Sequence, residues 1–279
     1  MNTDTYFRIG STHKICQDFA LSNDRNRKTG VIVGDPFIIV SDGCSTAEHS
    51  DIGARLLALA AKRHIDMAIG DDSFVCATKA MAEVSCRTLG LSRDALSATL
   101  LVGKATDVGI YGLIYGDGVI AARNRDGSLH FEEVRFVSGA PYYLRYELNP
   151  LDKANYIEKF GLKVELNRYK VDAKGVEKNT TSFDLDPARP FFSYAYDIEH
   201  WKTVALFSDG VSAFEKTVKT GTSISKDHVD LEIIIPELMA FKNFAGEFLQ
   251  RRSIRAFENF TSADIQGTDD VGIGVISTD

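Results

Sequence analysis

Apolar residues in the first 43 positions come in short runs, which is typical of β-strands. Three of these runs fit strands, at residues 14–21, 31–34 and 36–43. The polar and basic stretch 22–30 is typical of an exposed connection between the first two runs. This part of the chain therefore predicts a group of strands.

From Ser50 onward the apolar spacing changes to that of amphipathic helices. Ser50 and Asp51 are typical of a helix start, and a second helix is predicted within residues 71–90, where Gly90 is placed to end it. Both helices are expected to lie on a sheet. The residues expected on the buried face of the first are Ile52, Leu56, Leu59 and Ala60. Those expected on the buried face of the second are Phe74, Thr78, Met81 and Ser85.

Strand patterns return beyond Gly90 and predict consecutive antiparallel strands within residues 95–105, 107–124 and 128–137. The turn-like sequences ATD, GDG and RDG separate them. Residues 140–200 mix aromatic residues, prolines and polar runs, so we expect a mobile or family-specific insert there.

The C-terminal part adds a strand, two helical sections and a last strand, expected at residues 201–210, 231–241, 243–260 and 269–278. This order fits an α+β chain in which two antiparallel sheets pack together and helices cover them. No repeat or linker divides the chain, so a single domain over residues 1–279 is expected.

The net charge of the chain disfavours two classes of binding partner. Asp and Glu number 39 against 32 Lys and Arg, a formal charge of -7, so the chain lacks the basic field that favours nucleic acid or anionic lipid. No apolar stretch approaches the length of a membrane span, and the N-terminus has no secretory pattern, so we expect a cytoplasmic protein without a membrane or nucleic-acid partner. The scattered His and Cys residues show no zinc-ligand spacing.

The most informative feature is a repeated Asp-Gly pair at the end of an apolar strand. Asp42 and Gly43 end PFIIVSDG, and Asp209 and Gly210 end TVALFSDG. Asp-Gly is a common hairpin turn, but a hairpin needs a second strand directly afterwards. Here the chain becomes polar and then helical, so the hairpin interpretation is weakened at both places.

Two further acids join this pattern. Asp18 lies inside an apolar alternation and Asp269 opens the last strand. A carboxylate in such a place is costly unless it is paired or binds a metal. If these acids converge with Asp42 and Asp209, cations must offset their repulsion, and ligands made only of oxygen select Mg²⁺ or Mn²⁺ over Zn²⁺.

These segments, in order and approximate spacing, make the chain similar to the metal-dependent serine/threonine phosphatases of the 2C type, the PPM family. The segments are the QD at Asp18, the first SDG, ATLLVG, GDG, the second SDG and DDVGIGVI. They run from about residue 9 to residue 276, with a poor match at 140–200. The resemblance implies a four-layer αββα sandwich with two Mn²⁺ or Mg²⁺ ions at one end.

The resemblance also implies a role for each acid. Carried over by position, Asp42 bridges both ions, and Asp209 and Asp269 hold the first. The carbonyl of Gly43 holds the second ion, with Asp18 bound to it directly or through water. Asp117, in YGDGVI, matches a ligand of a weaker third metal, although a GDG turn also has a purely structural interpretation.

The chain departs from the family pattern at Cys44, Ser45 and Thr46, after the first Asp-Gly, and at two positions that bear more directly on the site. Where the family has an arginine that grips the substrate phosphate, this chain has His13, which is either a phosphate contact or proton donor, or a polar residue without a role. Asp270 stands where the family commonly has asparagine, which adds a negative charge beside the first metal. Asp42, Asp209 and His13 are the residues expected to take part in catalysis.

Two classes of function follow. The first is a phosphatase that hydrolyses phosphoserine, phosphothreonine or a small phosphoester with metal-activated water, with a phosphoprotein substrate and a cognate kinase as expected partners. The alternative is a catalytically silent protein of the same fold that binds a partner or a phosphoprotein. A metal-using hydrolase of different bond specificity stays open, because fold and metals do not determine the substrate.

Overall fold

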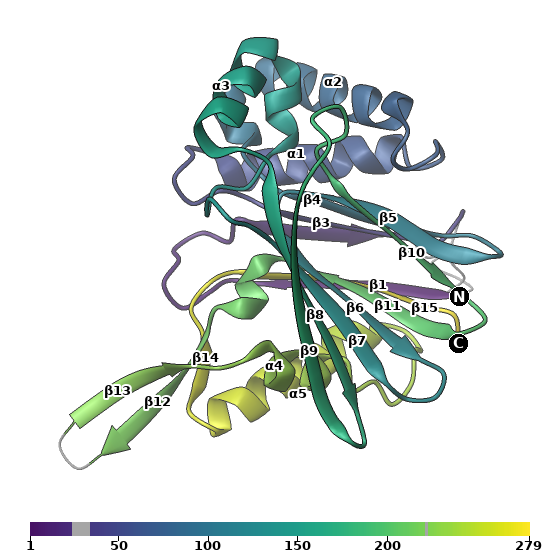
Figure 1. The fold of residues 1–279 in the computed structure, drawn as a ribbon, viewed down its shortest axis with the longest axis vertical. Helices are drawn as coiled ribbons and strands as arrows, with labels where there is room; N and C mark the ends of the chain where they lie inside the picture. Colours follow the sequence, from purple (N-terminus) through teal and green to yellow (C-terminus); the bar gives the residue numbers. More distant parts are fainter. Residues whose placement is uncertain (24–33, 221–222) are drawn as a thin grey trace.

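Two antiparallel sheets packed face to face form the centre of the computed structural model, which describes residues 1–23, 34–220 and 223–279. Helices cover the outer face of each sheet (Figure 1). The predicted α+β sandwich of four layers is therefore confirmed. None of the helices in the described ranges is long and apolar enough to cross a membrane.

The smaller sheet has five strands in the order β10-β5-β4-β3-β2. Their bounds are β2 Asp18–Ser22, β3 Phe37–Asp42, β4 Leu100–Ala105, β5 Gly109–Tyr115 and β10 Phe192–Asp197. The predicted strand at 36–43 is confirmed. The strand predicted from residue 14 begins only at Asp18, because Lys14 to Gln17 form a loop that leads to it. Residues 31–33 of the predicted run 31–34 and most of the connection 22–30 lie outside the described residues.

The larger sheet has seven strands in the order β1-β15-β11-β6-β7-β8-β9. Their bounds are β1 Asn2–Arg8, β6 Gly118–Asn124, β7 Leu129–Phe136, β8 Lys163–Asp172, β9 Gly175–Asp184, β11 Trp201–Phe207 and β15 Val271–Ser277. Every pairing in it is antiparallel. Apolar side chains from both sheets, including Ile38, Val40, Leu206 and Ile276, fill the space between them.

Helices α1 (Ser50–Arg63) and α2 (Asp72–Thr88) lie on the smaller sheet, and α4 (Leu231–Leu238) and α5 (Phe248–Ser262) lie on the larger one (Figure 1). α1 begins at Ser50 as predicted, and α2 lies within the predicted range 71–90. Short 3-10 turns occur at Arg93–Leu96, Leu144–Leu148 and Asp209–Ser212.

The buried faces of α1 and α2 differ from the prediction. Leu59 is 51% exposed and Met81 is 39% exposed. In α1 a face of small residues is buried instead, because a Cβ at Gly53 would lie 1.6 Å from the Ala95 carbonyl oxygen and only glycine permits that approach. In α2, Phe74 and Thr78 are buried as predicted, followed by Ala82 and Cys86.

The GDG sequence between β5 and β6 is not a hairpin turn, which corrects the prediction of consecutive strands in one sheet. β5 belongs to the smaller sheet and β6 to the larger one, so the chain changes sheets at Asp117. Gly116 and Gly118 have φ values of 91° and 145°, which favour glycine. The turn therefore places Asp117 at the end of the sandwich where the two sheets meet.

Residues 140–200 consist largely of regular elements. They comprise α3 (Pro150–Phe160), strands β8 and β9 of the larger sheet, and edge strand β10 of the smaller one. A three-stranded sheet that the sequence did not predict projects from the sandwich (Figure 1). It contains β12 (Phe214–Thr220), β13 (Ser223–His228) and β14 (Ile265–Gly267).

Candidate functional site

The first pair of acids lies at one end of the smaller sheet. Asp18 begins β2 and Asp42 ends β3, and because these strands are antiparallel, the two residues are directly opposite each other. Asp18 is 1% exposed. Like charges directly opposite on neighbouring strands are destabilising. The fold thus holds two acids in an arrangement that ordinary strand pairing disfavours.

The second pair lies at the same end of the larger sheet. Asp209 follows β11 and Asp269 precedes β15, and these neighbouring strands are antiparallel. Ser208 connects the two pairs, because its hydroxyl donates to Asp18 Oδ2 at 2.6 Å and accepts from the Gly272 amide at 2.8 Å. The second SDG sequence thereby contacts Asp18 across the interface between the sheets.

The glycine after each acid is required by close approach of another chain segment. A Cβ at Gly43 would lie 2.6 Å from the Ser50 carbonyl oxygen, and one at Gly210 would lie 1.7 Å from the Asp270 carbonyl oxygen. Neither contact can be accommodated by moving a flexible side chain. The Asp-Gly pairs are therefore packing requirements of the site, and neither one is a hairpin turn.

Burial and mutual repulsion hold these acids towards the neutral state. Burial, together with the charges of Asp209 and Asp270, raises the pKa of Asp18 to about 7, although hydrogen bonds with Asp42 and Ser208 oppose the change. Burial and the charges of Asp18 and Asp209 raise the pKa of Asp42 well above its usual value. Burial, with the charge of Asp269, also raises the pKa of Asp209. Protons compensate the repulsion when no cation is present.

The donor atoms present fit hard cations. Asp18 Oδ1 is buried and has no hydrogen-bond donor among the described residues, and the carboxyl group next to Asp18 is that of Asp42. Within residues 1–23, 34–220 and 223–279, no group of three or more His, Cys, Asp or Glu side chains is gathered as a metal cage. Instead the acids interact in successive pairs, Asp18 with Asp42 and Asp42 with Asp209. This set of oxygen atoms suits Mg²⁺ or Mn²⁺.

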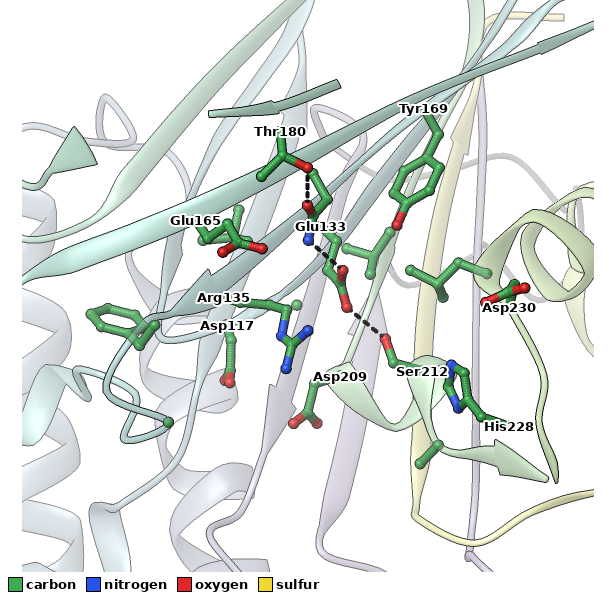
Figure 2. Close-up of a pocket in the computed structure, with 18 of the residues that line it drawn as sticks. Asp117, Glu133, Arg135, Glu165, Tyr169, Thr180, Asp209, Ser212, His228 and Asp230 are labelled. Atoms are coloured by element: carbon green, nitrogen blue, oxygen red, sulfur yellow. Dashed lines mark hydrogen bonds between the residues drawn. The ribbon is translucent and has the colours of Figure 1, made fainter. Parts of the chain in front are cut away.

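Asp117 borders a cavity of about 620 Å³ beside these acids, together with Asp209 and Asp269 (Figure 2). Burial raises the pKa of Asp117 well above its usual value, the charge of Asp209 adds to this, and the attraction of Arg135 opposes it. The structure thus places Asp117 beside the predicted ligands.

A hydrogen-bond network that sequence reasoning missed supports the Asp209 turn (Figure 2). Glu133, 9% exposed, accepts from Ser212 Oγ at 3.0 Å and from Asn167 Nδ2 at 3.0 Å. Thr180 Oγ1 in turn donates to Asn167 Oδ1 at 2.7 Å. Strands β7, β8 and β9 are thereby joined to the 3-10 turn that begins at Asp209. The single sequence signal was an acid within the apolar run of β7.

Two departures from the family pattern, His13 and Asp270, lie in contact. His13 Nδ1 is 3.2 Å from Asp270 Oδ1, and His13 Nε2 is 3.5 Å from Asp269 Oδ1. Asp270 also accepts from the amides of Gly10 at 2.7 Å and Gln17 at 2.6 Å. The Asp270 carboxylate therefore holds the loop that leads to Asp18, and the His13 ring lies against it.

The pKa of Asp18 leads to a prediction for the metal-free protein. An acid whose pKa is higher in the fold than in the unfolded chain costs stability as the pH rises from about 4 to about 7. Asp18→Asn should remove this cost and keep the Ser208 contact. We expect the variant to be more stable than the wild type by about 2–4 kcal/mol, or roughly 5–10 °C, at pH 8, and little changed at pH 4.

Thermal unfolding in EDTA at the two pH values measures this difference. A variant that is less stable than the wild type at pH 8, or that differs equally at both pH values, would show that the Asp18 carboxylate is not strained by its neighbours.

One family model and several solved structures are similar to this chain. Residues 11–132 match the model of the family described as Protein phosphatase 2C. Three solved structures share the fold over nearly their whole length. They are a bacterial serine phosphatase (10% identity, 100% of this chain and 98% of that chain covered, TM-score 0.56), serine/threonine phosphatase Stp1 from Staphylococcus aureus (10%, 100% and 96%, 0.54), and the PPM Ser-Thr phosphatase MsPP from Mycobacterium smegmatis in complex with cacodylate (13%, 99% and 98%, 0.53). No curated protein matches the chain significantly.

Proposed function

The chain is protein phosphatase 2C-like in sequence over residues 11–132 and in fold over its whole length, and we propose that it is a metal-dependent phosphatase. Its substrate is phosphoserine or phosphothreonine in a protein, or a small phosphoester. One observation carries this proposal: at the facing ends of the sheets, Asp42 lies opposite Asp18 on one side and interacts with Asp209 on the other.

Each acid has a place in the proposed centre. Asp42, which interacts with both Asp18 and Asp209, is the residue that would bridge two divalent cations. Asp209 and Asp269 would hold one cation, and the Gly43 carbonyl with Asp18 the other. Asp117 would serve a weaker third. When bound, two such ions make a water molecule acidic near neutral pH and offset charge on the phosphoryl group.

Neighbouring residues hold the proposed ligands in position. Ser208 fixes Asp18 Oδ2 and leaves Oδ1 for a cation, and the Glu133 network holds the turn that carries Asp209. His13, beside Asp269, is a proton donor or a partner of Asp270 in this proposal. The cavity next to Asp209 gives the phosphoester a path to the acids.

The other expectations from the sequence remain proposals. A single domain over residues 1–279 is supported by the pairing of β1 with β15, which joins the two ends of the chain in one sheet. A cytoplasmic location and a cognate kinase rest on the sequence and the family alone.

Purified protein should hydrolyse p-nitrophenyl phosphate and a phosphothreonine peptide in the presence of Mn²⁺, and EDTA should stop both reactions. The experiment compares metal-depleted protein with the same protein after Mn²⁺ or Mg²⁺ is restored. Hydrolysis that survives depletion would refute the proposal. Manganese binding without turnover of either substrate would favour the catalytically silent alternative.

A further inference from the structure

Arg135 lies in the cavity beside the acids without a partner of its own. It is an exposed residue of β7, and in Figure 2 its guanidinium lies between Asp117 and Asp209. Among the described residues, the Arg135 side chain is attracted electrostatically to Asp117 but forms no hydrogen bond or close ion pair. A planar cation with free donors therefore faces the proposed metal centre.

Three charged side chains that line the cavity with Arg135 are Glu133, Glu165 and Lys178. Glu165 is the residue opposite Arg135 on β8, but no hydrogen bond or ion pair joins the two among the described residues. Glu133, two residues earlier on the same face of β7, is already satisfied by Ser212 and Asn167. Lys178, the other strong cation lining the cavity, lies over the Tyr169 ring at 4.8 Å. The Glu133 hydrogen bonds also hold the β7 backbone that positions Arg135.

The N-terminal loop leaves a role open for such a cation. His13 faces Asp269 and Asp270, so its ring is directed at carboxylates. A single-point imidazole is also a weaker match to phosphate than a guanidinium, whose donor fork binds two oxygens at once. The cavity thus holds a bidentate donor, Arg135, whereas His13 is not among the residues that line it.

We propose that Arg135 binds the phosphate group of the substrate, in the cavity between Asp117, Asp209 and Ser212. This inference rests on the proposed function and adds to it the residue that recognises the phosphate. The site then takes a phosphate monoester dianion whose non-bridging oxygens reach the guanidinium while the phosphorus faces the acids. Arg135 contributes to binding and needs no proton transfer.

The test measures phosphate binding as well as turnover. Equilibrium dialysis with labelled inorganic phosphate, in Mn²⁺, compares the wild type with Arg135→Ala and Arg135→Lys. Loss of a charge-assisted contact should weaken phosphate binding roughly 10- to 100-fold in Arg135→Ala, with partial recovery in Arg135→Lys. The KM for p-nitrophenyl phosphate should rise by a similar factor. Arg168→Ala is the matched control, because Arg168 is a surface arginine of β8 that pairs with Glu132.

A double variant separates phosphate binding from simple neutralisation of Asp117. If Arg135 only offsets the Asp117 charge, Asp117→Asn should restore phosphate binding to Arg135→Ala. We expect the double variant to bind phosphate as weakly as Arg135→Ala, and full restoration would overturn the inference. So would equal phosphate binding by Arg135→Ala and the wild type, or no detectable phosphate binding by the wild type.

The outcome for the inference is separable from that for the proposed function. If the wild type and Arg135→Ala hydrolyse phosphoesters equally well, the inference about Arg135 is refuted and the proposed function stands. If the wild type binds phosphate through Arg135 but hydrolyses no phosphoester, the inference is supported and the proposed phosphatase activity is refuted.

Discussion

Asp42→Asn should abolish metal-dependent hydrolysis of p-nitrophenyl phosphate while leaving the fold intact. Asp42 interacts with Asp18 on its own sheet and with Asp209 on the other, so it lies between the two halves of the site. Substitutions in the outer shell of metal sites already cost about 10- to 100-fold. Loss of a bridging ligand should cost more than about 100-fold in kcat/KM.

Asparagine has nearly the same shape as aspartate, so the expected loss comes from charge and not from packing. The variant should unfold at the same temperature as the wild type in EDTA, or at a higher one, because a buried repulsion is removed. Asp227→Asn, in the exposed strand β13, is a control that should keep full activity. Retained turnover in Asp42→Asn would show that the two sheets do not share a metal centre.

Gly210→Ala should damage both the fold and the site. The added Cβ would lie 1.7 Å from the Asp270 carbonyl oxygen, where a main-chain atom must move. Asp270 cannot shift freely, because its side chain holds the amides of Gly10 and Gln17. We expect a loss of about 3 kcal/mol or more, roughly 10 °C in the unfolding temperature, and loss of manganese-dependent turnover.

Gly127→Ala provides the matched control for this steric argument. Gly127 has a φ of 95° but no neighbouring atom within 4 Å, so alanine there meets backbone strain without a clash. Its cost should be about 1 kcal/mol, with activity unchanged. Thermal unfolding of both variants separates the two effects, and an equal loss in both would argue against close packing of the two Asp-Gly turns.

The acids of the site could be predicted because their signal is local. Asp42 and Asp209 each follow an apolar strand, and the residues after them do not continue as a strand. Asp18 lies within an apolar run, and such a run predicts that the acid is buried in a strand. The architecture was also predictable, since the change from strand to helix period at Ser50 is unambiguous.

Other features depend on contacts between distant segments and left no local signal. The turn at Asp117 has the composition of a hairpin, and only the packing of its flanking strands into different sheets reveals a crossing. Gly10 and Asp270 are 260 positions apart, so the sequence could not show that Asp270 holds the loop containing His13. The sequence predicts a strand at Glu133 and Arg135 and nothing more, because their roles depend on which strands and turns surround β7.

Calorimetric titration of the metal-free protein with Mn²⁺ tests the central claim most directly. We expect two ions to bind with release of protons, since the pKa values of Asp18, Asp42 and Asp209 are raised and bound cations displace those protons. Affinity should therefore fall as the pH is lowered from 8 to 5, and Asp42→Asn should lose most of the binding. Absence of Mn²⁺ binding by the wild type, or equal binding by Asp42→Asn, would contradict a metal centre built between the two sheets.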